Sequence, residues 1–187
     1  MELIEKKLKG AYEVRMKPHL DERGFFMRTF DDEIFKNLGL ERKWVQENHS
    51  QSLRKGIVRG LHFQLPPYSE TKLIRCIRGE VLDVFVDLRK DSPTFGQWDS
   101  VLLSDKSFNA AFIPRGFAHG FCTLTDHSEV VYKVDNFYTP EAESGLLWND
   151  PEIGVEWPIN DDIMTSAKDA KNLTLAEFVA KHKALDV

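Results

Sequence analysis

The sequence lacks the features of secreted and membrane proteins. No stretch approaches the roughly 20 apolar residues that a membrane-spanning helix needs. The opening residues, MELIEKKLKG, carry charges in every turn, so we expect no secretory signal peptide and a cytoplasmic location. Cysteine is scarce as well: Cys76 and Cys122 lie far apart and form no CxxC pattern, so we expect two buried free thiols.

An excess of positive charge is also absent. The formal net charge of −5 argues against a general nucleic-acid binder. A small anionic ligand remains compatible with this charge, provided that a local cluster of arginines and lysines meets it. The 187 residues, 42% of them hydrophobic, show no internal repeat, low-complexity tract or Pro/Gly/Ser linker. We therefore expect one globular domain over residues 1–187 and no partner that is a membrane or a nucleic acid.

What the sequence does contain is a long region with the alternation of β-strands, between about residues 43 and 135. The clearest case is Leu73–Ile77 followed by Val81–Leu88, two strands joined through a turn at Gly79. Further strands are expected at Trp44–Asn48, Val58–Gln64, Phe108–Ile113, His119–Leu124 and Glu129–Asp135. Many short strands separated by Gly and Pro turns predict an all-β sandwich or barrel.

Helices are predicted only at the edges of this region. Asp32–Leu38 has a helical pattern that would end at Gly39, a natural cap position. Near the other end, Thr174–Glu177 matches a capping box, the signature of a helix start. We expect the helix that follows it to contribute packing rather than chemistry.

Two short segments suggest a more specific fold. Pro114–His119 has the pattern P-x-G-x-x-H, which resembles the second motif of the cupins, and Gly60–Gln64 resembles the first motif with its second histidine replaced by Gln64. Cupins are small antiparallel jelly-roll barrels whose interior often holds a metal. We therefore predict an all-β, cupin-type antiparallel jelly-roll barrel with short peripheral helices. Two histidines and an amide are a poor ligand set for zinc or iron, so we predict no metal and no other cofactor.

Several residues in or beside these segments have side chains suited to catalysis or anion binding. A barrel interior that keeps His62 without a metal favours acid–base use, because imidazole titrates near neutral pH. On the strand at 129–135, Tyr132 could donate or accept a proton if it faces the interior. Arg23, Arg59 and Lys72 could bind phosphate. The alternatives stay open: a structural histidine, a tyrosine in the core, and solvated surface cations.

Seven short motifs follow one another along the chain. They are Asp21–Phe26, Gln46–Ser50, Val58–Gln64, Lys72–Cys76, Ile113–Phe121, Trp148–Pro151 and Ser166–Asp169. In this order they resemble the dTDP-4-dehydrorhamnose 3,5-epimerase family over nearly the whole chain. The resemblance implies an epimerase that inverts the carbons flanking the ketone of dTDP-4-dehydro-6-deoxyglucose, giving dTDP-4-dehydrorhamnose. It also implies a nucleotide-sugar substrate and a homodimer whose subunits share a strand and part of each active site.

The same resemblance implies roles for individual residues. His62 would be the general base, held by Asp169, and Tyr132 the acid on the opposite face, while Lys72 would polarise the ketone. Substrate contacts would come from Arg23, Gln46, Glu47, Asn48, Arg59, His119, Tyr138, Glu143 and Lys168. One position departs from the family pattern: Arg28 stands where a glutamate is usual, which could alter how the nucleotide end is held.

Three rival interpretations remain at the level of sequence. A metal-dependent cupin, such as a dioxygenase or sugar isomerase, would use the same scaffold with a bound ion. A non-catalytic cupin could bind a nucleotide sugar without needing an acid and a base. A close relative of the double epimerase could invert one carbon only, or act on another nucleotide-linked 4-keto sugar.

Overall fold

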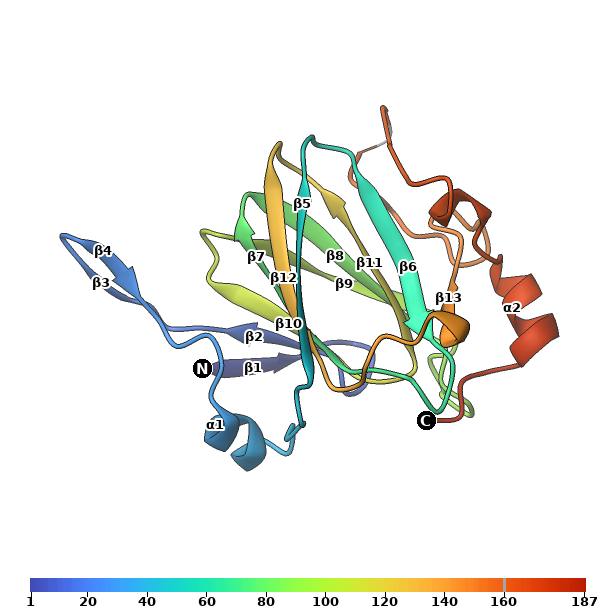
Figure 1. The fold of residues 1–187 in the computed structure, drawn as a ribbon, viewed down its shortest axis with the longest axis horizontal. Coiled ribbons are helices and arrows are strands. Elements are labelled where there is room, and N and C mark those ends of the chain that lie inside the picture. The colour runs from blue at the N-terminus through green and yellow to red at the C-terminus, as the bar shows by residue number, and fades with distance from the viewer. Residues whose placement is uncertain (160) are drawn as a thin grey trace.

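Two antiparallel sheets face each other in the computed structural model, which describes residues 1–159 and 161–187 (Figure 1). The first sheet has six strands in the order β1-β2-β10-β7-β12-β5. Their bounds are β1 Glu2–Glu5, β2 Tyr12–Arg15, β5 Gln46–Ser52, β7 Lys72–Arg78, β10 Asn109–Ile113 and β12 Ser128–Val134. Along β5 the residues alternate between a less exposed face with Asn48 and Ser50 and an exposed face with Glu47.

The second sheet has five strands in the order β13-β6-β11-β8-β9. Their bounds are β6 Val58–Gln64, β8 Glu80–Asp87, β9 Trp98–Ser104, β11 Phe117–Thr123 and β13 Glu143–Gly145. All neighbouring strands in the two sheets run antiparallel. Together the sheets form the cupin-type jelly-roll barrel that the sequence predicted.

The strongest strand prediction is confirmed, with a detail that the sequence did not give. β7 and β8 follow each other through Gly79, whose φ of +79° suits a residue without a Cβ. The two strands do not pair with each other, because β7 belongs to the first sheet and β8 to the second. The turn therefore passes the chain from one wall of the barrel to the other.

The core lies on both faces of β8. Val81 and Phe85 point into the space between the sheets, where they pack with residues of β7, β10 and β11. Val84 and Val86 face the opposite way and pack under the C-terminal part of the chain, which includes Phe178. Burial on both faces explains why β8 reads as a nearly continuous apolar run. The outer layer also brings residues 164–169 against the edge of β6.

Helices are short and peripheral, as predicted (Figure 1). The α-helices are α1 Asp32–Asn37 and α2 Leu175–His182, and the 3₁₀ helices are η1 Pro140–Ala142 and η2 Asp169–Lys171. The predicted capping box of α2 is present, with Thr174 and Glu177 bonding each other's backbone N–H groups. No helix among residues 1–159 and 161–187 is long and apolar enough to cross a membrane. Cys76 and Cys122 are buried and free.

A two-stranded hairpin extends away from the barrel (Figure 1). It consists of β3, His19–Asp21, and β4, Gly24–Phe26, and every residue in both strands is exposed. Leu20, Phe25 and Phe26 expose 70%, 56% and 72% of their surface, which is a large apolar area for an arm in water. An isolated hairpin of this size is marginally stable by itself.

Two glycines let β6 and β11 approach closely in the middle of the barrel. A Cβ on Gly120 would lie 2.5 Å from the carbonyl oxygen of Arg59, and one on Gly60 would lie 2.6 Å from the Cα of Gly120. The close approach sets the register in which His62 and His119 are direct cross-strand partners. Gly60 of the first cupin-like motif and Gly120, directly after the second, thus bring the two motif histidines together.

We expect Gly120→Ala to lower the free energy of unfolding by about 1–3 kcal/mol, because the added methyl group meets backbone that cannot move aside. Urea-induced unfolding of both proteins measures the difference. Gly39→Ala serves as the control, because nothing lies within 4 Å of that site and only its φ of +73° strains the new residue. A Gly120→Ala protein as stable as the parent would contradict this account of the register.

Candidate active site

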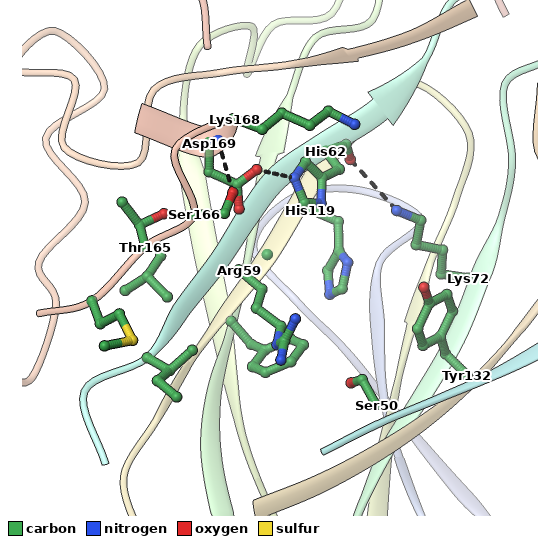
Figure 2. A pocket seen from close by; sticks show the side chains of 15 residues that line it. Ser50, Arg59, His62, Lys72, His119, Tyr132, Thr165, Ser166, Lys168 and Asp169 are labelled. Carbon is green, nitrogen blue, oxygen red and sulfur yellow. Dashed lines mark hydrogen bonds and ion pairs between the residues drawn. The ribbon is translucent and has the colours of Figure 1, made fainter. Parts of the chain in front are cut away.

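A cavity of about 480 Å³ opens between the two sheets. Strands β5, β6, β7, β11 and β12 line it, together with residues of the segment 164–169. Seven of the residues expected at the site are among its walls: Arg59, His62, Lys72, His119, Tyr132, Lys168 and Asp169. Figure 2 shows His62 and Asp169 on one side of this cavity, and Lys72 and Tyr132 on the other. A base candidate and an acid candidate therefore share one space.

His62 is held by a carboxylate from the outer layer of the molecule. Its Nε2 lies 2.7 Å from Oδ1 of Asp169, and the other oxygen of Asp169 accepts the Gly60 N–H at 3.2 Å. Burial works to raise the pKa of Asp169, but the hydrogen bonds from His62 and Gly60 outweigh it, so the pKa lies below its usual value. An ionised Asp169 accepts a hydrogen bond from the Nε2–H of His62, which leaves Nδ1 of a neutral His62 as the basic nitrogen.

A second histidine–carboxylate pair lies deeper in the barrel. Nε2 of His119 is 2.8 Å from Oδ2 of Asp83, and both side chains are buried. Burial lowers the pKa of His119 and raises the pKa of Asp83, so both shifts favour an uncharged pair. The other oxygen of Asp83 has no hydrogen-bond partner among the described residues. Asp83 thus fixes the orientation of the His119 imidazole, which lines the cavity.

Lys72 and Tyr132 complete the inner part of the cavity. Lys72 comes from the start of β7 and is 7% exposed, with its ammonium 3.3 Å from Glu70 and 3.5 Å from the carbonyl oxygen of His62. Tyr132 packs with Val130 and other interior residues, so its phenol stands among apolar walls. The condition set for Tyr132, that its face be the barrel interior, is met.

Two further cations lie at the outer part of the cavity. Arg59 donates to Ser52 Oγ at 3.1 Å and to the carbonyl oxygen of Gln51 at 3.0 Å, which fixes its guanidinium. Lys168 pairs with Glu143, and the hydrogen bond between them raises the pKa of Lys168. A chain with a net negative charge thus gathers Arg59, Lys72 and Lys168 around one space, as an anionic ligand requires.

Four more predicted residues lie next to the cavity rather than in its wall. Tyr138 is 52% exposed, and its hydroxyl donates to Glu143 at 2.7 Å, so the Glu143–Lys168 pair connects it to the wall. Gln46 and Asn48 share the less exposed face of β5 with the cavity residue Ser50. Gln46 also accepts the backbone N–H of Tyr138 at 3.3 Å. These four form a rim.

Three residues that the sequence singled out lie elsewhere in this chain. Glu47 is on the outer face of β5, where it pairs with Lys133 at 3.1 Å. Arg23 is in the hairpin turn, paired with Asp21 and exposed. Arg28 contacts Asp31, the N-cap of α1, at 2.7 Å. None of the three lines the cavity formed by the described residues of this single chain.

Sequence reasoning missed several residues of the site. Ser50, Thr165 and Ser166 line the cavity, and the hydroxyls of Ser50 and Thr165 have no partner among the described residues. Ser50 could have been found, because it follows Asn48 by two positions on a strand. Asp83 could also have been found from the sequence, because it is a charged residue inside the apolar run of β8. Thr165 could not, because only the fold brings its segment to the barrel.

The described residues contain no group of three or more His, Cys, Asp and Glu side chains placed to hold a metal ion. Gln64, the residue in the position of a cupin ligand, uses its amide elsewhere. Its Oε1 accepts the Thr139 N–H at 2.6 Å, and its Nε2 lies 2.9 Å from Glu70.

Comparison with known proteins adds to this geometry. The family model described as dTDP-4-dehydrorhamnose 3,5-epimerase matches residues 5–177. A dTDP-4-dehydrorhamnose 3,5-epimerase of Shigella flexneri is 51% identical over 146 residues, which cover 78% of this chain and 80% of that protein.

Solved structures agree with the sequence comparison. The crystal structure of dTDP-4-dehydrorhamnose 3,5-epimerase from Bacillus anthracis, with TDP and pyrophosphate bound, is 43% identical and covers 93% of this chain and 99% of its own, with a TM-score of 0.90. The dTDP-6-deoxy-D-glucose-3,5-epimerase of Legionella pneumophila, in complex with dTDP-4-keto-L-rhamnose, is 37% identical with a TM-score of 0.92. That match covers 99% of this chain and 97% of the Legionella chain.

We expect Asp169→Asn to change the tautomer of His62, because an amide can donate to Nε2 where the carboxylate only accepts. ¹⁵N NMR of the histidine side chains distinguishes a proton on Nε2 from one on Nδ1. The parent protein should carry the neutral-state proton on Nε2 and the variant on Nδ1. His119 is the internal control, since its partner is Asp83; an unchanged His62 spectrum would contradict the assigned hydrogen bond.

Proposed function

The chain belongs to the dTDP-4-dehydrorhamnose 3,5-epimerase family, and we propose that His62 and Tyr132 are the base and acid with which it inverts the sugar carbons. As a member, it is an epimerase of a dTDP-linked 4-keto-6-deoxy sugar. The observation that carries the residue assignment is the shared cavity, with an imidazole and a phenol on different walls. Binding alone would need neither group.

Inversion next to a ketone needs only proton transfer. His62 takes the hydrogen from the carbon beside the carbonyl, and the electron pair of that C–H bond moves into an enolate. Tyr132 then gives its hydroxyl proton to the same carbon from the opposite face. A positioned base of this kind contributes about 10²–10⁴ in rate. Because both inverted carbons flank one ketone, the same pair of groups serves two such steps, and exchange with water resets their protons.

The negative charge on the enolate oxygen needs a nearby cationic group that is shielded from water. Lys72 supplies it, being 7% exposed and on the same side of the cavity as Tyr132. Removing one such fixed donor typically lowers the rate by about 10²–10³. Asp169 keeps His62 in one orientation and stabilises the imidazolium that forms, as the aspartate of a catalytic triad does. His119 is fixed by Asp83 and lies between His62 and Tyr132, where it could contact the sugar (Figure 2).

The nucleotide diphosphate fits the outer part of the cavity. Arg59 and Lys168 provide charge there, and Tyr138 offers an aromatic ring at the rim. The Bacillus relative was crystallised with TDP and pyrophosphate, which are ligands of this chemistry. Holding this remote end places the reacting carbon near the base.

We also propose a homodimer in which each hairpin completes the partner's site. The β3–β4 hairpin exposes Leu20, Phe25 and Phe26 and carries Arg23 at its turn, away from the cavity of its own chain. A second copy of the chain would cover this apolar arm and receive an arginine suited to phosphate.

The proposal also covers the domain organisation and the cellular location of the enzyme. Apart from the β3–β4 hairpin, the elements of the described residues form the two sheets or pack against them, so we infer a single domain over residues 1–187. We place the enzyme in the cytoplasm, which its free cysteines support, because thiols stay reduced there. The proposed chemistry uses side chains of the protein without a cofactor.

In heavy water, we expect two variants to separate proton removal from inversion. His62→Ala should lose deuterium exchange into the substrate by about 10²–10⁴ while dTDP still binds, because the base is gone and the anion site is intact. Tyr132→Phe should keep exchange and lose inversion, because abstraction survives without the acid. Mass spectrometry and proton NMR count the exchanged positions, two for a double epimerase. Normal inversion by Tyr132→Phe, or retained exchange in His62→Ala, would remove that residue from its role.

For the shared site, we expect complementation between two weak variants. Arg23→Ala and His62→Ala damage different chains of one site, so each mixed dimer holds one native site, and an equal mixture should recover about a quarter of the parent's activity. Assays at low substrate concentration after co-expression measure this recovery. A mixture of His62→Ala and Tyr132→Phe is the control, since both residues come from the same chain. No recovery in the first mixture would argue against an exchanged hairpin.

A further inference from the structure

We propose that Glu70 is a positioning residue that holds Lys72 at the ketone, and that Gln64 fixes Glu70 by linking it to the rim loop 137–139. The proposal rests on the role assigned above to Lys72. It concerns two side chains that line no part of the cavity wall and touch no reacting atom.

Lys72 needs a fixed partner if its ammonium is to stay in one place. Lysine has a flexible four-carbon stem, and its charge is a point with rotatable donors rather than a rigid fork. Oε1 of Glu70 lies 3.3 Å from the ammonium, and both side chains are shielded, with 13% and 9% of Glu70 and Lys72 exposed. The charge of Lys72 also acts on the buried Asp83. Glu70 therefore determines which of the nearby acceptors the lysine faces.

Glu70 is itself held in place by Gln64. The other carboxylate oxygen, Oε2, accepts from Nε2 of Gln64 at 2.9 Å. Gln64 is 3% exposed, and the same nitrogen lies 3.0 and 3.1 Å from the carbonyl oxygens of Tyr68 and Phe137, so its two N–H groups are shared among three acceptors. A buried amide with all of its groups engaged has little freedom to move.

The same amide reaches the rim of the cavity. Oε1 of Gln64 accepts the Thr139 N–H at 2.6 Å, and Nε2 of Gln64 contacts the carbonyl oxygen of Phe137. Gln64 therefore contacts the residues on both sides of Tyr138. The Tyr138 N–H donates to Gln46. The short loop that carries Tyr138 is thus tied to Gln64, Gln64 to Glu70, and Glu70 to Lys72. A single chain of hydrogen bonds and one ion pair runs from the nucleotide end of the site to the ketone end.

The test compares Glu70→Gln with the parent enzyme. The amide keeps a partner for Gln64 and removes the charge that holds Lys72. We expect kcat to fall by about 10–100-fold, less than the loss on removing the lysine itself, because a small displacement of a charged donor is enough to slow the reaction. The dissociation constant for dTDP should stay within about threefold, because the cations of the outer cavity are untouched. Glu152→Gln, the same change at an exposed glutamate, is the matched control and should leave kcat unchanged.

Lys72→Met, alone and combined with Glu70→Gln, distinguishes positioning from general structural damage. If Glu70 acts through Lys72, the double variant is no slower than Lys72→Met. A further loss in the double variant, or a normal kcat for Glu70→Gln, would overturn the proposal. Glu70→Asp keeps the charge on a shorter stem and should recover part of kcat, which gives a second reading if Glu70→Gln folds poorly.

The two levels of the proposal fail in different ways. An active Lys72→Met enzyme would remove Lys72 from the mechanism, and the role of Glu70 would be lost with it. An inactive Lys72→Met enzyme together with a fully active Glu70→Gln enzyme would leave the proposed mechanism intact and overturn the role of Glu70 alone.

Discussion

The hydrogen bond between His62 and Asp169 joins the two parts of the molecule on which the site depends. His62 belongs to an inner strand of the barrel, and Asp169 arrives from the layer that covers the outside of the second sheet. The carboxylate can reach the imidazole only because that layer packs on the apolar outer face of β8 and its neighbours. Packing far from the cavity thereby sets the tautomer of the proposed base, through a carboxylate whose pKa is held below its usual value.

Several ionisable side chains of the cavity and its rim are arranged in pairs. His119 contacts Asp83, Lys72 contacts Glu70, and Lys168 contacts Glu143. An unpaired charge in such a place would be costly, and each pair also fixes a direction for the side chain that faces the cavity. The wall therefore offers oriented groups without needing to rearrange when a substrate enters, which is the condition for stabilising a short-lived enolate. Two of these partners, Asp83 and Glu70, stand behind the residues that they orient.

The hairpin is the feature from which we propose that a second chain completes the site. The barrel holds the proposed base and acid together with several cations, whereas Arg23 stands on an exposed apolar arm that points away from them. Covering such an arm with another surface would bury its apolar side chains and stabilise it. In the proposed dimer, docking of the hairpin on the second chain would both bury its apolar residues and bring Arg23 to a site.

The sequence by itself determined the strands at the centre of the barrel, the capped ends of its helices, and the residues with the chemistry for proton transfer, but it missed β1, β2, β9 and β13. Alternation and glycine turns are local signals, and they identified β6, β7 and β8 closely. Tertiary structure alone decided which of these side chains meet. It placed Glu47 on the outer face, carried Arg23 away, and brought Thr165 and Asp83 to the site. The reason is physical: a strand's pattern gives the face of a residue, but the partner across that face comes from packing between segments far apart in the chain.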